Sequence, residues 1–313
     1  MDIIKQVITE LHRKYQNLHE GKLASYIPEL AKANPDHFAI VAISVDGSIT
    51  KVGNADIPFS LQSTSKAFTY GMILESYDRE FILSKVGVEP TGEAFNSIVE
   101  LEKHTHRPYN PMINSGAIAV SSLIKGEGLE ARLQNTLNYF GKYAGHPLQI
   151  DESVFRSEKG TAHRNRSIAH LLRHFGVIDD RIEESLDLYF QQCSILANTQ
   201  DLAMMAATLA NNGFNPATKE RAIKEEFVPD ILSLMFTCGM YDSSGEWAYK
   251  VGIPAKSGVS GAIFGVIPGK MGIAVYSPLI DDKGHSIRGV HVFEEMSKKL
   301  GLSIFKGISH HAR

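Results

Sequence analysis

The N-terminal segment repeats apolar side chains at helical spacing. Along residues 2–16, one face of the predicted helix carries Ile3, Ile4, Val7, Ile8, Leu11 and Tyr15. An uninterrupted apolar run at 38–44 is typical of a buried strand. The Asp46-Gly47 turn that follows favours a hairpin, so residues 49–53 are predicted to be its return strand.

Strand-like runs return near the other end of the chain. Residues 258–268 and 271–277 flank the Pro268-Gly269 turn, and residues 289–300 are predicted to form a closing helix. Between about 61 and 245 the apolar spacing is mostly helical and is broken by Gly and Pro turns.

Strands at both chain ends and helices between them predict a mixed α/β (α+β) fold. Because strands usually pair with their sequence neighbours, the economical arrangement is one antiparallel sheet, built from both ends and covered by the terminal helices. We expect one domain over residues 1–313, with a sheet lobe at about 1–60 and 246–313. A helical lobe at about 61–245 would lie beside the sheet, and a ligand site is expected in the cleft between them.

Composition narrows the possible partners. The 313 residues are 43% hydrophobic and 21% charged, which is enough to bury a large core. The formal net charge is −3, and acidic and basic residues are interspersed along the chain. This pattern does not predict binding to nucleic acid or to an anionic membrane. No apolar run approaches the roughly 18 residues of a membrane span, and the early acids of the N-terminus are unlike a signal peptide. With only Cys193 and Cys238, neither a disulfide scaffold nor a zinc cluster is expected, which fits a reducing cytoplasm.

Serine and lysine three residues apart are the first candidate chemistry. The chain has four Ser-x-x-Lys tetrads: Ser48/Lys51, Ser63/Lys66, Ser122/Lys125 and Ser303/Lys306. Of these, Ser63 and Lys66 open a predicted helix, where residues three apart share a face and free backbone N–H groups favour a developing anion. The pair is either a nucleophile with its activating amine or a helix cap beside a solvated lysine.

Lys256-Ser257-Gly258 is the second candidate motif, in a predicted strand with Gly261 nearby. Taken alone, it fits either a strand that a ligand approaches closely or an edge strand protected by its lysine. Ser-x-x-Lys early and Lys-Ser-Gly late is the layout of penicillin-recognising serine acyl-transfer enzymes. Their middle Ser-Asp-Asn motif is absent, but Tyr241 precedes the second motif and is either a proton relay or a packed loop tyrosine.

Other chemistries have weaker sequence support. No Gly-x-Ser-x-Gly elbow is present, so a Ser-His-Asp hydrolase is not indicated. His170 and His174 are four residues apart but lack the metalloprotease glutamate, and we expect them on a helix surface. Residues 126–131 formally fit a dinucleotide fingerprint, but two glutamates there would repel a pyrophosphate.

With both motifs in place, the chain resembles the serine-dependent glutaminases, relatives of the β-lactamase fold. The resemblance runs from about Gly21 to Val292 and includes the blocks PFSLQSTSKAF, HRPYNPMINSGAI, SEKGTAHRN, LDLYFQQCSI, CGMYD and IPAKSGVSGAIFGVIP. Many long blocks in the same order make it specific. It implies a β-lactamase/transpeptidase-like fold, with an antiparallel sheet flanked by terminal helices and an all-helical lobe.

The resemblance also implies catalytic roles. Ser63 matches the nucleophile and Lys66 its activating partner. Tyr26 and Tyr241 match hydroxyls that contact the nucleophile, and Tyr241 is the stronger candidate for proton transfer. Val259 matches the residue whose backbone N–H completes the oxyanion hole with that of Ser63.

Further positions match substrate-binding or supporting residues of the family. The substrate-binding set is Ser63, Asn114, Glu158, Asn165, Tyr189, Tyr241 and Val259. Lys256, Ser257 and Gly258 are the supporting set. The carboxylate of Glu158 suits a substrate ammonium, while the amides and the Tyr189 hydroxyl can hold a substrate carboxylate. We also expect a cationic neighbour such as Lys256 to lower the pKa of a buried Lys66.

The implied activity is hydrolysis of the side-chain amide of L-glutamine to L-glutamate and ammonia through a γ-glutamyl-serine acyl-enzyme. Nothing in the sequence requires a metal or an organic cofactor. The family also implies a homodimer or homotetramer. Two alternatives remain open: a β-lactamase or peptidase-type acyl hydrolase, and a non-catalytic glutamine-binding sensor.

Overall fold

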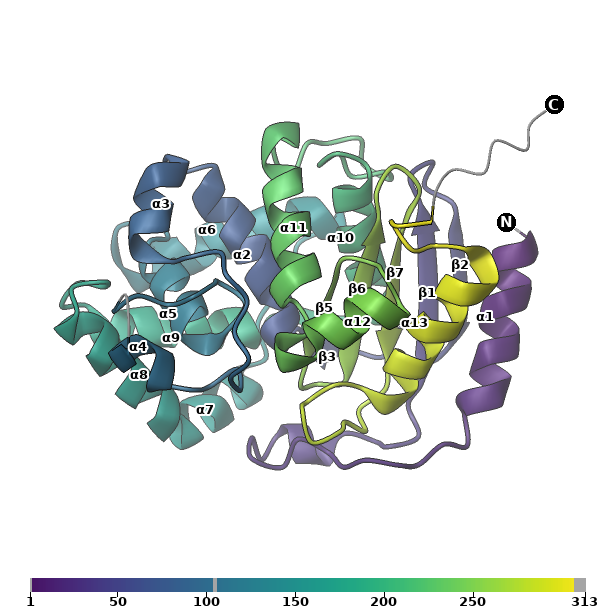
Figure 1. Ribbon diagram of the computed structural model, residues 1–313, viewed down its shortest axis with the longest axis horizontal. Coiled ribbons are helices and arrows are strands. Elements are labelled where there is room, and N and C mark those ends of the chain that lie inside the picture. Colours follow the sequence, from purple (N-terminus) through teal and green to yellow (C-terminus); the bar gives the residue numbers. More distant parts are fainter. Residues whose placement is uncertain (1, 104–105, 307–313) are drawn as a thin grey trace.

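The computed structural model describes residues 2–103 and 106–306, so residues 1 and 307–313 of the predicted domain lie outside it. A twisted antiparallel sheet occupies one side of the molecule, and a block of helices occupies the other (Figure 1). The fold is therefore the mixed α/β class that the sequence predicts.

The sheet has five strands in the order β2-β1-β7-β6-β5, all antiparallel. The strands are β1 (Ala39–Ser44), β2 (Ile49–Gly53), β5 (Ala255–Gly258), β6 (Ala262–Ile267) and β7 (Met271–Tyr276). The predicted strands at 38–44, 49–53 and 271–277 are confirmed to within one residue at each end. Because β1 pairs with β7, the two ends of the chain meet in the middle of the sheet.

The predicted strand at 258–268 is wrong in its first residues. Strand β5 ends at Gly258, the chain turns, and β6 starts at Ala262. Gly261 makes this turn with a left-handed φ of +95°, and a Cβ there would lie 2.2 Å from the Ser277 carbonyl oxygen. The Lys-Ser-Gly motif consequently lies on its own strand, at the edge of the sheet.

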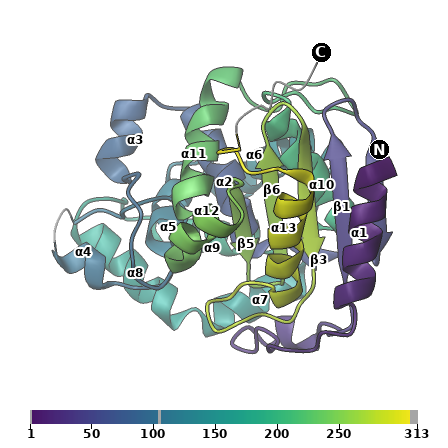
Figure 2. The same ribbon diagram turned by 45° about the vertical axis from the view of Figure 1, so that its right-hand side comes forward.

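Both faces of the sheet are covered by helices. Helices α1 (Asp2–Tyr15) and α13 (Ile287–Leu300) pack side by side on one face (Figures 1 and 2). Val7, Ile8 and Leu11 of α1 are buried as predicted, but Ile3 is 62% exposed and does not belong to the buried face. Helix α10 (Thr199–Ala210), from the middle of the chain, lies against β7, β6 and β1.

Helix α12 (Ser244–Lys250) lies beside α13, where its Trp247 ring centroid is 5.4 Å from that of Phe293. The remaining helices form the block beside the sheet. They are α2 (Ser65–Leu74), α3 (Arg79–Lys85), α4 (Val99–Lys103), α5 (Asn114–Ser122), α6 (Gly128–Ala144), α7 (Glu152–Thr161), α8 (His163–His174), α9 (Ile182–Cys193) and α11 (Val228–Cys238). Short 3₁₀ turns are η1 (Leu30–Lys32), η2 (Gln62–Thr64), η3 (Glu225–Phe227) and η4 (Tyr241–Ser243). A two-stranded ladder joins β3 (Phe59–Ser60) to β4 (Leu196–Ala197).

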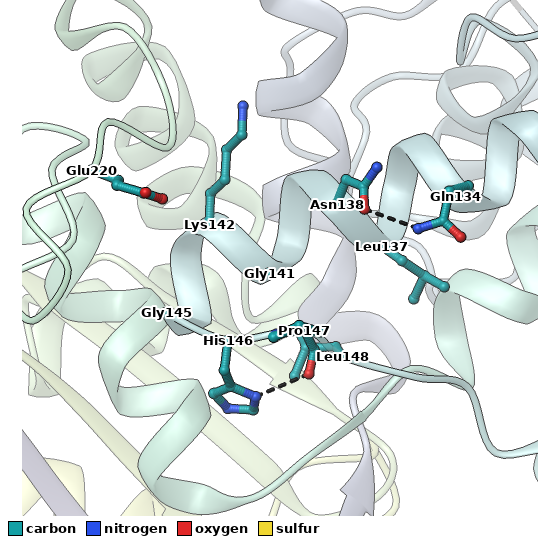
Figure 3. Close-up of a pocket in the computed structure, with 10 residues that line it drawn as sticks. All are labelled: Gln134, Leu137, Asn138, Gly141, Lys142, Gly145, His146, Pro147, Leu148 and Glu220. Atoms are coloured by element: carbon teal, nitrogen blue, oxygen red, sulfur yellow. Dashed lines mark hydrogen bonds between the residues drawn. The ribbon is translucent and has the colours of Figure 1, made fainter.

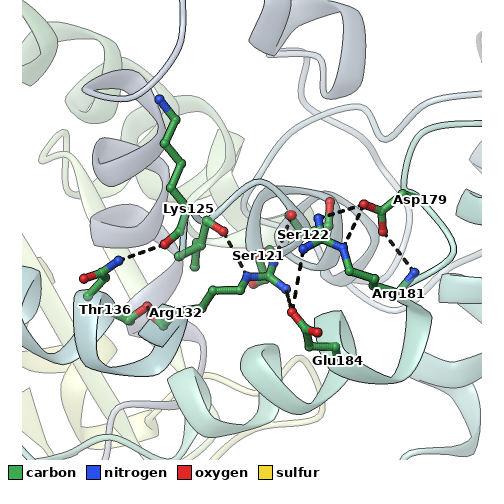
Figure 4. Close-up of polar contacts among 10 residues, drawn as sticks. Ser121, Ser122, Lys125, Arg132, Thr136, Asp179, Arg181 and Glu184 are labelled. Carbon is green, nitrogen blue, oxygen red and sulfur yellow. Dashed lines mark hydrogen bonds and ion pairs between the residues drawn. The ribbon is translucent and has the colours of Figure 1, made fainter. Parts of the chain in front are cut away.

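Arg132 organises the centre of this block from a fully buried position on α6. Its guanidinium donates to the Ser121, Ser122 and Ile124 carbonyl oxygens at 2.8, 2.9 and 2.9 Å, which satisfies the open carbonyls at the end of α5. It also pairs with Glu184 of α9, so one cation joins three helices (Figure 4). The opposite, N-terminal end of helix α5 begins at Asn114, one of the predicted substrate-binding residues.

The contact between α10 and the sheet gives a test of the packing. A Cβ on Gly272 of β7 would lie 2.2 Å from the Ala207 nitrogen and 2.6 Å from the Ala203 carbonyl oxygen, both on the α10 backbone. We expect Gly272→Ala to lower the free energy of unfolding by about 2–3 kcal/mol, because helix and sheet must separate. Urea unfolding followed by circular dichroism measures this.

Gly160→Ala is the matched control. Gly160 is exposed on helix α7, and a Cβ there would meet nothing within 4 Å. The substitution should leave stability unchanged or raise it by up to about 1 kcal/mol, because alanine favours a helix over glycine. Equal unfolding midpoints for the two variants would contradict the close approach of α10.

Candidate active site

Ser63 lies in the 3₁₀ turn η2, two residues before α2 begins. The sequence predicted that Ser63 would lie in the first turn of the α-helix. This prediction is corrected locally, because a 3₁₀ turn precedes the helix. Gln62 adopts a left-handed φ of 49°, an uncommon conformation for a residue with a side chain. The hydroxyls of Thr64 and Ser65 donate to the carbonyl oxygens of Leu61 and Gln62 and fix the turn.

Strand β5 packs directly against this turn. A Cβ on Gly258 would lie 2.9 Å from the Leu61 carbonyl oxygen and 3.3 Å from the Thr64 nitrogen. The absence of a side chain at position 258 thus lets two backbones approach closely. Val259, the next residue, and Ser63 line the same pocket.

Lys66 is 1% exposed and lies one turn after Ser63. Its Nζ donates to Asn114 Oδ1 at 2.7 Å and lies 3.4 Å from the Met112 carbonyl oxygen. The Tyr189 hydroxyl donates to the same Oδ1 at 3.3 Å, and Asn114 Nδ2 donates to Asn165 Oδ1 at 3.0 Å. Helices α2, α5, α8 and α9 therefore converge on one chain of hydrogen bonds.

Burial sets the protonation of the two lysines. It lowers the pKa of Lys66 to about 8, with Cys193 and Glu158 acting in the opposite direction. It also lowers the pKa of the fully buried Lys256, and the nearby charge of Lys66 lowers it further. The predicted direction for Lys66 is confirmed, but its cause is desolvation. The charge effect between the two lysines lowers the pKa of Lys256 and is not among the causes of the Lys66 shift.

Tyr241 lies between these lysines and Ser63. It has a left-handed φ of 51°, and its ring centroid is 4.0 Å from Lys256 Nζ and 5.8 Å from Lys66 Nζ. Its hydroxyl is buried and has no hydrogen-bond partner among the residues of 2–103 and 106–306. Burial raises the pKa of Tyr241, while the nearby Ser63 side chain lowers it. The two hydroxyls are thus neighbours, without a hydrogen bond of normal geometry between them.

Glu158 is a buried carboxyl on α7. Gln62 Nε2 donates to its Oε2 at 3.4 Å and to Ser60 Oγ at 3.3 Å. Burial raises the pKa of Glu158 to about 7, with Gln62 and Lys66 opposing the shift. A ligand cation at this position would replace the lost hydration of the carboxylate.

One pocket brings most of the predicted residues together. Its lining includes Tyr26, Ser63, Asn114, Glu158, Asn165, Tyr189 and Val259. Tyr26 is 54% exposed and so borders solvent rather than the core. Lys66 contacts the lining through Asn114, and Lys256, Ser257 and Gly258 lie behind it on β5.

Sequence reasoning missed several residues that line the pocket, among them Gln62, Phe95 and Arg164. Phe95 lies in a loop and contacts the Tyr241 ring, with ring centroids 5.0 Å apart. None of the three belongs to a motif with its own chemistry. Gln62 had one available signal, which is its position directly before the candidate nucleophile.

Other candidate groups lie outside this pocket. His170 and His174 are exposed on α8, as predicted. Within the described ranges, no three His, Cys, Asp or Glu side chains gather as metal ligands, and no helix has the length and apolarity to span a membrane. A second cavity lies along α6 and the loop after it, and its lining includes Gln134, Lys142 and His146 (Figure 3). His146 also pairs with Asp201 at 2.8 Å. This cavity contains none of the predicted site residues.

Comparison with known proteins supplies the family. Residues 21–305 match the family model described as Glutaminase. A glutaminase of Trichormus variabilis is 57% identical over 300 residues, which are 96% of this chain and 90% of the relative. The solved structure of a probable glutaminase, ybaS, has a TM-score of 0.94 at 40% identity, over 97% of this chain and 98% of that chain. A structure of Mglu in its glutamate form has a TM-score of 0.92 at 40% identity, over 96% and 69% of the two chains.

The buried amine of Lys66 gives a stability prediction. We expect Lys66→Met to raise the free energy of unfolding at pH 7 by about 1–3 kcal/mol, because a charged amine is replaced by an apolar chain. The pKa of Lys66 is lowered in the folded state, so the unfolded chain binds more protons between about pH 8 and 10.5. The contribution of this group to the free energy of unfolding of the wild type therefore rises across that window. The stability gained by Lys66→Met becomes smaller as a result.

Urea unfolding at pH 7 and pH 9.5 measures the difference. Lys51→Met is the control, because Lys51 belongs to another Ser-x-x-Lys tetrad and its side chain is on the surface beside Asp56. The control should change stability by less than about 0.5 kcal/mol at either pH. A destabilised Lys66→Met at pH 7 would show that the amine is needed for folding.

Proposed function

The chain belongs to the serine-dependent glutaminase family, and we propose that Ser63 is the nucleophile with which it hydrolyses L-glutamine. It is an amidohydrolase with the β-lactamase-like fold of its structural neighbours. One observation carries the proposal. Ser63 lines the pocket beside a buried amine of lowered pKa, and its neighbour is the Tyr241 hydroxyl, which has no hydrogen-bond partner among the described residues.

Glutamine offers an α-ammonium, an α-carboxylate and a terminal amide. Glu158 is the proposed partner of the ammonium, because it is the buried carboxyl of the pocket. Asn114, Asn165 and Tyr189 are proposed to hold the carboxylate through neutral hydrogen bonds. The glutamate form of the related Mglu supports an amino-acid ligand of this size. Tyr26, at the exposed margin, is proposed to contact the nucleophile when substrate is bound.

Acylation begins with loss of the Ser63 proton, either directly to Lys66 or to Tyr241, which then passes its own proton to Lys66 because its raised pKa keeps the phenol protonated. A pKa of about 8 leaves part of Lys66 neutral near pH 7, so it can accept this proton. Ser63 Oγ attacks the amide carbon, and the backbone N–H groups of Ser63 and Val259 stabilise the oxyanion. Each such donor is typically worth about 3–4 kcal/mol in the transition state. The C–N bond then breaks, and the departing nitrogen takes a proton from Tyr241 or Lys66 to leave as ammonia.

Deacylation repeats the sequence with water. The same base removes a proton from water, and the resulting hydroxide attacks the γ-glutamyl ester carbon. The C–O bond to Ser63 breaks, and the serine oxygen recovers a proton from Lys66 or Tyr241. Glutamate leaves, and the proposed steps use this chain, glutamine and one water molecule.

We also propose that residues 1–313 form a single domain. One hydrophobic cluster includes residues of the sheet and of the helical block, and Phe68 of α2 stacks on Phe264 of β6 with centroids 5.2 Å apart. A cytoplasmic location is proposed because Cys193 and Cys238 are both buried free thiols, which fits a reducing compartment. The homodimer or homotetramer remains a prediction from the family resemblance.

Ser63→Ala tests the nucleophile. Ammonia release from L-glutamine should fall at least about 10³-fold, because no acyl-enzyme can form. An acid-quenched sample of the wild type with glutamine should show the mass of one added γ-glutamyl group on the peptide that contains Ser63. Ser48→Ala, in another Ser-x-x-Lys tetrad, should keep wild-type activity.

Two further substrates separate the alternatives in the same assay. L-asparagine and a chromogenic cephalosporin should turn over much more slowly than glutamine. Glutamine turnover that survives in Ser63→Ala would overturn the serine mechanism. Cephalosporin turnover that exceeds glutamine turnover would support the β-lactamase alternative, and glutamine binding without turnover would support the sensor.

The raised pKa of Glu158 predicts how glutamine binding depends on pH. As pH falls through about 7, Glu158 gains a proton and loses the charge that holds the substrate ammonium, so KM for glutamine should rise. The rate at saturation should instead follow the neutral form of Lys66 and increase up to about pH 8. Steady-state kinetics from pH 5.5 to 9 measures both trends.

Glu158→Gln should raise KM at least about 10-fold and remove its rise at low pH. Glu152→Gln is the control on the same helix, because Glu152 is exposed and pairs only loosely with Arg156 at 3.9 Å. It should leave KM and its pH dependence unchanged. A KM that rises at low pH in Glu158→Gln as in the wild type would assign the titration to another group.

A further inference from the structure

His285 is a buried imidazole that the proposed mechanism does not use. It is 2% exposed and lies in the loop between β7 and α13. Its Nδ1 is 2.9 Å from Ser257 Oγ, in the centre of the Lys-Ser-Gly motif. Its Nε2 has no hydrogen-bond partner within residues 2–103 and 106–306. Burying a polar imidazole costs free energy, so its contacts should indicate a role that offsets this cost.

The imidazole stacks on the ring of Tyr241. The two centroids are 5.8 Å apart, and the planes differ by 17°. Phe95, Lys256 Nζ and Lys66 Nζ also lie near this phenol ring, at 5.0, 4.0 and 5.8 Å from its centroid. Since the Tyr241 hydroxyl has no hydrogen-bond partner in the part of the chain that the structure describes, these ring contacts orient the phenol.

The loop that carries His285 is tied to the turn that carries Tyr241. Lys283 Nζ donates to Ser243 Oγ at 3.1 Å and pairs with Asp242 at 3.5 Å. Within the loop, the His285 backbone N–H donates to Asp281 Oδ1 at 2.9 Å. Loop 281–286 and η4 therefore hold each other in place.

We propose that His285 is a positioning residue, whose ring fixes the phenol of Tyr241 against Ser63 while Ser257 fixes the ring of His285. The proposal rests on the proposed role of Tyr241 in proton transfer. A misplaced hydroxyl lowers a proton-transfer rate steeply, because donor and acceptor must be within hydrogen-bond reach. His285 acts through Tyr241 and touches no reacting atom.

The charge of His285 agrees with this role. Burial lowers the pKa of His285 to about 4, Lys256 adds to the shift, and Asp281 opposes it. Asp242 and Lys283 also face the ring, with opposite and smaller effects. At neutral pH the ring is uncharged and can lie beside Lys256 without repulsion. It therefore works as a flat surface and a hydrogen-bonding group.

Two substitutions separate the ring from the hydrogen bond. His285→Asn keeps a polar group where Nδ1 meets Ser257 but removes the ring. We expect its kcat to fall about 10-fold, with KM within about twofold and Tm close to wild type. His285→Phe keeps a ring on Tyr241 but leaves Ser257 Oγ without its partner. We expect its Tm to fall while kcat stays within about threefold of wild type.

A merely structural residue would make rate and stability change together. The opposite order, with an active His285→Asn and an inactive His285→Phe, would overturn the proposal and assign His285 to anchoring β5. His291→Asn and His291→Phe are the controls, because His291 stacks on Tyr15 and lies on α13. Both should keep wild-type kcat.

A double-mutant cycle with Tyr241→Phe gives a second measurement in the full chain. If His285 acts through the Tyr241 hydroxyl, His285→Asn should lower single-turnover acylation less than about twofold in the Tyr241→Phe background. The same factor of about 10 in both backgrounds would overturn the proposal. Tyr241→Phe with wild-type kcat would instead refute the proton-transfer role of Tyr241, so the two failures are distinguishable.

Discussion

The active site depends on how closely strand β5 approaches the turn that carries Ser63. At Gly258 the strand backbone is so near Leu61 and Thr64 that a side chain would have to displace one of them. Because β5 is the edge of the sheet and the turn begins the helical block, this contact places Val259 and Ser63 on one pocket. Two backbones, rather than two flexible side chains, thus set the proposed oxyanion hole, which favours preorganisation.

That close approach also explains the buried charges. Lys256 and Lys66 come from the two packed segments, and both side chains are buried. The protein accommodates them by lowering their pKa values, and it raises the pKa of Glu158 on the far side of the pocket. Such groups cost stability, but they supply a neutral amine and a carboxyl that titrates near neutral pH, both of which the proposed mechanism uses.

The sequence predicted those parts of the fold that depend on local pattern. The strands at 39–44, 49–53 and 271–276 and helix α13 were found because apolar runs and turn residues mark them directly. The break between β5 and β6 was missed, because the turn at Gly261 is imposed by the Ser277 backbone across the sheet. Gln62 and His285 were missed for the same reason, since their partners are distant in sequence. The convergence of the family-matched residues on one pocket agrees with the motifs, and their roles remain proposals.

Backbone conformation identifies the site independently of any motif. Five described non-glycine residues have a left-handed φ: Gln62, His106, Asn212, Lys219 and Tyr241. The three others are exposed, while Gln62 and Tyr241 are buried and both adjoin Ser63. Each such conformation costs on the order of 1–2 kcal/mol, which a glycine would avoid. A glycine would also remove the amide that binds Glu158 or the hydroxyl beside Ser63. The two buried left-handed residues therefore lie where the proposed mechanism uses their side chains, which agrees with the proposed site.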